Sequence, residues 1–307
     1  MGFTAELFPC IVTYIKKVIE IRSEVNGMEQ ETLRNLESQA REVRKYTIDT
    51  IAHLGVGHIG GACSVVEILT LLYFYEMNVR PAEPLWRERD KLVLSKGHAG
   101  PALYSTLALK GFFPMDWLQT LNQGGTNLPS HCDRNKTPGI DMTTGSLGQG
   151  LSAACGLALA NRIDRIDSSY IYAIIGDGET DEGQNWEAAM FAAHNRLSKL
   201  IAFTDYNKLQ LDGTTEQILD LGDLEGKWRT FGWFVLRCDG HDIGALAAAI
   251  VSAKAQSGLP GAMPSMIIMD TIKGKGADFA EGLLTNHNMN VDRATADKAI
   301  AALYGEK

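Results

Sequence analysis

The sequence predicts an α/β protein built on a doubly wound, mostly parallel β-sheet with helices on both faces. Apolar runs that end in polar or glycine residues recur along the chain, segments of helical character separate them, and no internal repeat or low-complexity linker interrupts the pattern. Strands that alternate with helices in this way form parallel sheets covered on both faces. The predicted strands are KLVLS (91–95), SSYIYAIIGD (168–177), LIAFTDYN (200–207), WFVLRCDG (233–240) and SMIIMDT (265–271).

Residues 29–290 are predicted to form one domain, with an N-terminal extension (1–28) before it and a helical tail (291–307) after it. The extension contains the stretch CIVTYIKKVIEI, which is too short and too charged to cross a bilayer, and we expect it to be poorly ordered. A helix is predicted from Glu29 and is expected to pack on the sheet. Its apolar residues fall near one face: Leu33, Leu36, Ala40, Val43, Ile48 and Ile51.

Polar residues mark the expected starts of later helices. Ser64 and Glu67 have the spacing of a capping box in front of the apolar run 68–72, so a second helix is predicted to begin at Ser64. A further helix is expected near Gly183, and Asp242 is predicted to cap the helix over 243–254.

Composition excludes several classes of protein. The chain has 307 residues, 45% of them hydrophobic, which suffices for a buried core. Its net charge of -8, with no cationic cluster, argues against a nucleic-acid partner. Five cysteines without a Cys-x-x-Cys pair favour packing thiols over disulfides or zinc. No apolar run reaches the roughly 18 residues of a membrane helix and no signal peptide is recognisable, so we expect a cytoplasmic protein.

Two predicted strands end in residues that suit a metal-bridged diphosphate. Asp177 follows the strand over 170–175 and Asn207 follows the strand over 200–205, at the sheet edge where ligands bind in such folds. Magnesium prefers oxygen ligands and often shares substrate phosphates. Gly176 and Gly178 let the backbone approach a phosphate, and the helix from Gly183 adds a positive end. The alternative is that Gly-Asp-Gly forms only a turn.

Four histidines lie in predicted loops rich in Gly, Pro or Asn. They are His58 in GVGHIGG, His98 in LSKGHAG, His131 in NLPSHCD and His287 in LLTNHN. Loops on a rigid scaffold are where catalytic groups concentrate, although a single loop histidine is more often only solvated or hydrogen-bonded. The other three, His53, His194 and His241, are expected to be structural.

The stretch GDGETDEGQNWEAAMFAAHNRLSKLIAFTDYNKLQLDG (176–213) resembles the thiamine diphosphate motif of transketolases, which opens with Gly-Asp-Gly and closes with an Asn about thirty residues later. The resemblance implies that the side chains of Asp177 and Asn207 and the main-chain carbonyl of Leu209 bind a divalent cation: Mg²⁺, or another such as Ca²⁺ or Mn²⁺. It also implies that the Gly178 amide donates to the diphosphate, next to Gly176. Glu182 matches a glutamate through which paired active sites communicate.

The same resemblance assigns roles to the histidines and to a loop. It implies that His98 and His287 reach the diphosphate, and that His58, His131 and His287 handle the sugar hydroxyls and proton transfer. TTGSLGQG (143–150) is similar to the family's substrate-channel loop, with Gly145 and Leu147 beside the thiazolium and aminopyrimidine rings. TIKGKG (271–276) also fits the family. Ile59 stands where the family usually has Pro, and Asn288 where it has Gly.

The resemblance covers residues 30–290, which correspond to the first third of a transketolase. It implies the thiamine diphosphate-binding fold and a separate C-terminal subunit, which carries the pyrimidine-binding domain and the glutamate that activates the cofactor, in a two-plus-two assembly. Transfer of a two-carbon ketol unit from a ketose or ketose phosphate to an aldose is the implied reaction. Pentose phosphate metabolism is the default pathway, and sulfosugar breakdown and natural-product assembly are equally compatible.

Two other functions are compatible with these motifs. The chain could belong to another thiamine diphosphate enzyme, such as the decarboxylating component of a 2-oxoacid dehydrogenase, or it could be a non-catalytic regulatory half. Trp186, Met190 and Phe191 are expected to be covered by the partner subunit, unless they are ordinary core residues.

Overall fold

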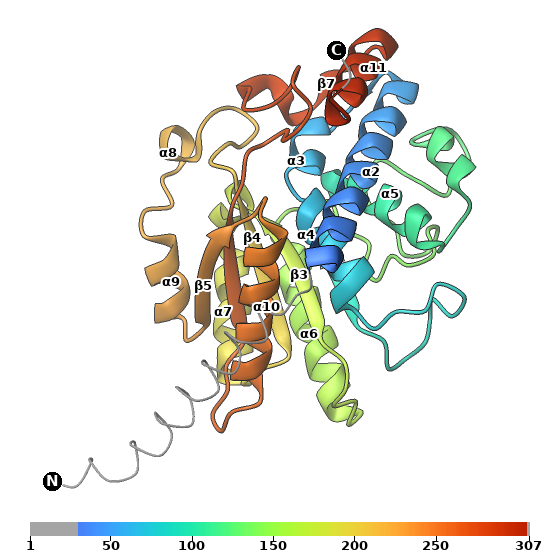
Figure 1. Cartoon of the computed structure of the whole chain (residues 1–307). Helices are drawn as coiled ribbons and strands as arrows, with labels where there is room; N and C mark the ends of the chain where they lie inside the picture. Colours follow the sequence, from blue (N-terminus) through green and yellow to red (C-terminus); the bar gives the residue numbers. More distant parts are fainter. Residues whose placement is uncertain (1–29, 306–307) are drawn as a thin grey trace, which may run out of the picture.

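A parallel five-stranded sheet forms the centre of the computed structural model, which describes residues 30–305 (Figure 1). The strands run β2-β3-β4-β6-β5 across the sheet, and each neighbouring pair is parallel. Their bounds are Lys91–Leu94 (β2), Ile171–Gly176 (β3), Leu200–Tyr206 (β4), Phe234–Asp239 (β5) and Ser265–Asp270 (β6). The predicted fold class and all five predicted strands are confirmed. The extension predicted at 1–28 lies outside the described residues.

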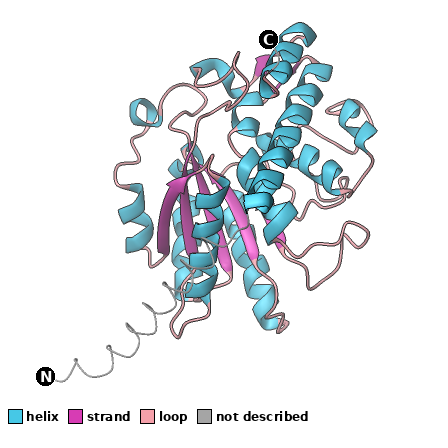
Figure 2. Ribbon diagram, viewed as in Figure 1, coloured by secondary structure: helices cyan, strands magenta, loops and turns pink. Residues whose placement is uncertain are grey.

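Helices cover both faces of this sheet (Figure 2). Successive residues of β3 alternate between two hydrophobic clusters. Tyr172 and Ile174 belong to the cluster that includes residues of α2, α4, α5 and α10, whereas Ile171, Ala173 and Ile175 belong to the cluster that includes residues of α6, α7 and α9. The helix bounds are Gln30–Leu54 (α2), Ile59–Cys63 (α3), Val66–Leu71 (α4), Gly100–Lys110 (α5), Gln149–Ile163 (α6), Gly183–His194 (α7), Thr215–Ile218 (α8), Leu224–Thr230 (α9), Ile243–Ser257 (α10) and Arg293–Leu303 (α11).

Helix α2 buries the face that its sequence predicts, but against helices. Leu36, Ala40, Val43, Ile48 and Ile51 are all buried, and the main partners of α2 are α5, α11 and α4. The prediction that this helix packs directly on the sheet is therefore wrong. Helix α10 lies against β5 and β6 on that face of the sheet, and α2 packs on α10 and α4, so α2 adds an outer layer.

The capping box predicted at Ser64 and Glu67 is also wrong. Ser64 follows α3, and Val65 stands at the start of α4 without a side-chain cap. The Ser64 hydroxyl donates instead to a carboxylate oxygen of Asp205 (2.6 Å), and Glu67 forms an ion pair with Arg44 (2.6 Å). Both side chains have charged partners on distant elements, and charge-assisted hydrogen bonds are stronger than a neutral cap.

A second, two-stranded sheet joins segments from the two ends of the described chain. β1 (Val56–Gly57) pairs antiparallel with β7 (Met289–Asn290), which brings the loops on either side together. Asp242 caps α10 as predicted, accepting from the Ala245 amide (3.0 Å). The segment predicted as a helical tail contains α11, which packs on α2. Across residues 30–305, no helix is both long and apolar enough to cross a membrane.

Candidate functional site

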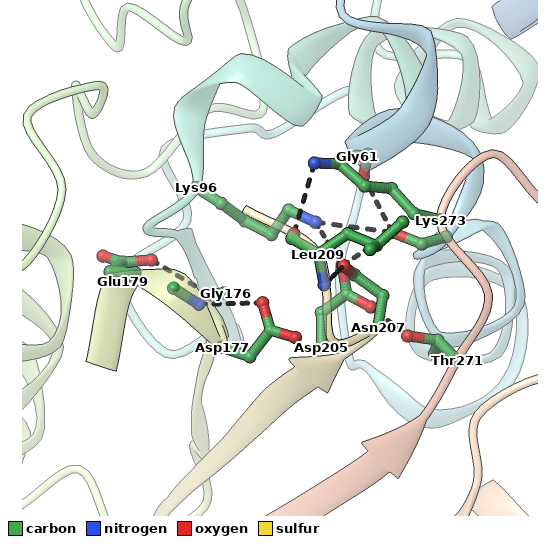
Figure 3. A network of polar contacts seen from close by, with 12 residues as sticks. Gly61, Lys96, Gly176, Asp177, Glu179, Asp205, Asn207, Leu209, Thr271 and Lys273 are labelled. Carbon is green, nitrogen blue, oxygen red and sulfur yellow. Dashed lines mark hydrogen bonds and ion pairs between the residues drawn. The ribbon is translucent and has the colours of Figure 1, made fainter. Parts of the chain in front are cut away.

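The two strand ends that the sequence singles out meet at one cavity. Asp177 follows β3 and Asn207 follows β4, and these neighbouring strands are paired with Gly176 opposite Asp205. Both side chains line a cavity of about 140 Å³ at the carboxyl edge of the sheet, and Figure 3 shows them side by side above β4. The shared sheet edge that the sequence predicts is therefore present.

Asp177 is held in place by backbone amides. Its carboxylate accepts hydrogen bonds from the amides of Gly178 (2.8 Å) and Lys208. Burial, together with the nearby Asp205 carboxylate, raises the pKa of Asp177 to about 7. A cation in the cavity would offset both effects, because a positive charge favours the ionised carboxylate. The Gly178 amide, predicted to face a diphosphate, donates here to Asp177.

The predicted metal ligands present oxygen atoms to the same cavity. The Asn207 side-chain oxygen accepts from the Leu209 amide (3.1 Å), and its amide group donates to Asp205 (3.0 Å). The Leu209 carbonyl accepts from the Lys273 ammonium (3.2 Å), so a cation already lies against it. Within residues 30–305 no cluster of three His, Cys, Asp or Glu side chains could hold a metal. One carboxylate, one amide and one carbonyl instead fit Mg²⁺, which keeps waters and phosphate oxygens as further ligands.

Two buried lysines at the site were missed by sequence reasoning. Lys96 is 2% exposed and forms an ion pair with Asp205, which also accepts hydrogen bonds from Ser64 (2.6 Å) and Thr271. Although burial alone would raise it, this ion pair holds the pKa of Asp205 below its usual value. Burial and the charge of Lys96 lower the pKa of Lys273 to about 8. Both lysines line the cavity, where their charges suit an anion such as a diphosphate.

A buried glutamate that the sequence did not single out joins three loops of the site. Glu179 accepts from the Gly148 amide (2.9 Å) and the Ser95 hydroxyl with one oxygen, and from the Gly176 amide (3.0 Å) with the other. These partners lie in the 143–150 loop, after β2 and at the end of β3. Burial raises the pKa of Glu179. The three loops therefore depend on one carboxylate for their relative positions.

Four predicted histidines form a cluster at the cavity. The centroid of the His58 ring lies 5.5 Å from that of His98, 5.5 Å from that of His131 and 5.4 Å from that of His287. The centroids of the His98 and His287 rings lie 4.8 Å apart. His98 and His287 line the cavity beside Asp177. The pairing of β1 with β7 brings the His58 and His287 loops together.

The histidine cluster is neutral near pH 7. Burial, with contributions from His131 and Lys273, lowers the pKa of His58 to about 4. Burial, with Lys273 next in size, lowers the pKa of His287 to about 4. Neutral imidazoles both donate and accept hydrogen bonds, which suits contact with hydroxyl groups and transfer of protons.

The 143–150 loop places its two predicted residues at the site. Leu147 lines the cavity. Gly145 has a φ of 147°, and a Cβ there would lie 3.0 Å from the His131 ring, so both its conformation and its space favour glycine. The loop thus lies against the histidine cluster on one side and the cavity on the other.

Helix α7 turns the remaining predicted residues away from the cavity. Glu182 is exposed just before the helix begins. Trp186 packs on Trp228, with ring centroids 4.9 Å apart, and so belongs to the core. Met190 (53%) and Phe191 (43%) are exposed. Of the three residues expected to be covered by a partner subunit, only Met190 and Phe191 are therefore exposed in this chain, and Trp186 is a core residue.

The other three histidines lie outside the cavity lining. His53 and His194 are exposed. His241 uses both ring nitrogens, which contact Glu67 (3.1 Å) and the Ile272 amide (2.8 Å).

Residues 36–304 match the family described as "Transketolase, thiamine diphosphate binding domain". The chain is 56% identical over 272 residues to the 6-deoxy-6-sulfo-D-fructose transketolase subunit SqwG of Clostridium sp. (strain MSTE9), covering 89% of this chain and 97% of the relative. It is 41% identical over 248 residues to an apulose-4-phosphate transketolase subunit of Actinobacillus succinogenes, covering 80% of this chain and 88% of that relative.

Longer transketolases match over part of their length. The mouse enzyme is 34% identical over 278 residues, which cover 91% of this chain and 43% of the mouse chain. A solved transketolase mutant of Pichia stipitis superposes with a TM-score of 0.82 at 31% identity, covering 89% of this chain and 41% of that one. The chain thus spans about two fifths of these full-length proteins.

Proposed function

Because the chain belongs to the transketolase family and matches its thiamine diphosphate-binding domain, we propose that it forms the N-terminal half of a two-chain transketolase. The reaction would transfer a two-carbon ketol unit from a ketose donor to an aldose acceptor. The family resemblance predicted from the sequence is confirmed.

The observation that carries this proposal is the meeting of Asp177, Asn207 and Leu209 at one cavity with Lys273. Their oxygens would hold Mg²⁺, or Mn²⁺ or Ca²⁺ in its place, and the metal would bind the cofactor diphosphate. Thiamine diphosphate supplies an electron sink for breaking the bond next to a ketose carbonyl. The protein's part is to orient the reactants and to handle protons.

The other residues of the cavity would contact the diphosphate and the rings of the cofactor. His98, with Gly176 and Gly178, would contact the diphosphate, and Lys96 would add positive charge there. Gly145 and Leu147 would lie against the cofactor rings.

The histidine cluster would act on the sugar. His58, His131 and His287 would hydrogen-bond the substrate hydroxyls and pass protons, since the lowered pKa values of His58 and His287 keep these rings neutral near pH 7.

A separate partner subunit would complete the active site. The relatives that this chain nearly spans are named as subunits, whereas the full-length transketolases are more than twice as long. We propose that the partner carries the pyrimidine-binding domain and that two copies of each chain assemble. Met190 and Phe191, exposed on α7 beyond Glu182, would lie in this assembly's interfaces.

The first donor to test is 6-deoxy-6-sulfo-D-fructose, because the relative named for it is 56% identical, against 41% for a relative named for apulose 4-phosphate. Pentose phosphate substrates and a cytoplasmic location are further parts of the proposal. The relatives do not favour a 2-oxoacid dehydrogenase or a regulatory half, because they are named transketolase subunits.

The test is co-expression with a neighbouring reading frame that encodes a pyrimidine-binding domain, followed by a ketol-transfer assay. We expect turnover with 6-deoxy-6-sulfo-D-fructose that exceeds turnover with xylulose 5-phosphate and needs both chains, thiamine diphosphate and Mg²⁺. Asn207→Leu should abolish it, whereas the exposed control His194→Asn should not. Turnover by this chain alone would contradict the proposal.

A further inference from the structure

We propose that His241, which lies outside the cavity, is a positioning residue that sets where the 271–276 loop places Lys273. This inference rests on the proposed function, because its consequence is the affinity for the metal-bound cofactor. His241 lies between β5 and α10, and the loop follows β6.

A buried ion pair fixes the orientation of the His241 ring. Arg44 on α2 contacts one oxygen of Glu67 on α4 (2.6 Å), and both side chains are about 9% exposed. The other Glu67 oxygen lies 3.1 Å from Nδ1 of His241. The Ile272 amide donates to Nε2 of the same ring (2.8 Å). Because Nε2 must accept, Nδ1 carries the proton and donates to Glu67, so the neutral ring has a single tautomer.

Arg44 holds the other end of the same loop. Its Nε donates to the Lys275 carbonyl (2.8 Å), and its Cδ would lie 2.5 Å from a Cβ on Gly276. Gly276 also has a φ of 77°, which favours glycine. The loop is therefore anchored at Ile272 and at Lys275, on either side of Lys273.

Lys273 projects from this anchored loop into the site. Its ammonium donates to the carbonyls of Leu209 (3.2 Å) and Gln210 (3.4 Å) and lies 3.4 Å from Nδ1 of His287. The buried Asn286 side chain donates to the Lys273 carbonyl (3.1 Å). The loop is thus held by Asn286 and by two anchors outside the cavity lining, His241 at Ile272 and Arg44 at Lys275.

The effect of this anchor is positional. Arg44 and Glu67 neutralise each other, and the His241 ring is neutral when Nε2 accepts, so the three side chains together add no net charge near the cavity. Releasing the Ile272 amide would instead let Lys273 move relative to Leu209. Small displacements of a positioning group are known to be costly in binding and catalysis.

Two substitutions of His241 separate its two hydrogen bonds. His241→Asn places an amide nitrogen near the Nδ1 position and keeps the Glu67 bond, but it loses the acceptor for Ile272. His241→Gln places an oxygen near the Nε2 position and keeps the Ile272 bond, but it loses the donor to Glu67. His194→Asn, on the exposed end of α7, is the matched control.

The measurement is equilibrium binding of thiamine diphosphate with Mg²⁺ to the full chain assembled with its partner subunit. We expect His241→Asn to weaken binding roughly 3- to 10-fold, the effect of one lost hydrogen bond, and His241→Gln and the control to stay within about twofold of wild type. In a Lys273→Met background, His241→Asn should add little further loss, because both changes act through the same side chain.

Three results would overturn the inference. The first is that His241→Asn and His241→Gln bind thiamine diphosphate as tightly as wild type. The second is that both variants lose affinity equally and also have lower melting temperatures. The third is that the loss of affinity from His241→Asn is as large in the Lys273→Met background as in wild type. If the wild-type assembly bound no thiamine diphosphate, the proposed function would fail and this inference with it. Wild-type binding with unchanged variants would remove the inference alone.

Discussion

Replacing Lys96 with Met should test the buried ion pair at the base of the site. Lys96 is 2% exposed and Asp205 is fully buried, so the substitution leaves a charged carboxylate without its cation. Met nearly preserves the length of the side chain, so little packing is lost.

The expected loss follows from the contacts that remain. Breaking a buried ion pair by removing one partner costs about 3–5 kcal/mol. Asp205 keeps hydrogen bonds from Ser64, Thr271 and Asn207, so we expect the lower end, about 3 kcal/mol. For a domain of this size, that corresponds to a melting temperature about 6–12 °C lower.

Urea unfolding of the single and double variants measures this effect. Lys96→Met with Asp205→Asn should recover about half of the loss, since no buried charge is then unpaired. Arg229→Met, which removes an exposed ion pair with Glu225 (2.5 Å), is the control and should cost less than about 0.5 kcal/mol. A loss below about 1 kcal/mol for Lys96→Met, or no recovery in the double variant, would refute the reasoning.

Three further predictions concern the rest of the site. Glu179→Gln should lower the free energy of unfolding by about 1–3 kcal/mol, because an amide cannot accept all three hydrogen bonds. An unchanged urea midpoint would contradict the role of Glu179 in holding the three loops together. The contribution of His58 and His287 to stability should fall as pH drops from 6.5 toward 4, since their lowered pKa values mean that these two residues bind more protons in the unfolded chain in that window. Replacing both His58 and His287 with Gln should reduce the dependence of the unfolding free energy on pH, and a dependence equal to that of wild type would argue against neutral histidines. Chelating Mg²⁺ should weaken thiamine diphosphate binding roughly 10- to 100-fold, and Asp177→Ala should bind weakly whether or not a chelator is present.

The strands, and the meeting of Asp177 with Asn207 at one edge of the sheet, could be predicted because both depend on local sequence. β3 and β4 are buried on both faces and so appear as continuous apolar runs. Asp177 and Asn207 follow those runs directly, and parallel strands bring their carboxyl ends to one edge.

The residues that were missed depend on contacts between distant parts of the chain. Lys96 and Lys273 stand inside LSKGHAG and TIKGKG, so a lysine in a glycine-rich loop after an apolar strand was the available signal. Nothing in the local sequence distinguishes Glu179 from its acidic neighbours Asp181 and Glu182. Its role in joining three loops comes only from hydrogen bonds to residues such as Gly148 that the fold brings close.

The two errors have the same origin. Ser64 and Glu67 match a capping box in sequence, but Asp205 and Arg44 are stronger partners in the fold. The apolar face of α2 correctly predicts burial, but a hydrophobic stripe does not say whether a sheet or a layer of helices covers it.

The position of the metal tests the account most directly. Crystals of the assembled enzyme grown with thiamine diphosphate and Mn²⁺ would locate that ion by its anomalous scattering. We expect one peak per copy of this chain, bound by the side chains of Asp177 and Asn207 and the carbonyl of Leu209, and no peak at this position in Asp177→Ala. A Mn²⁺ ion bound elsewhere, with cofactor present and these three oxygens unliganded, would contradict the account.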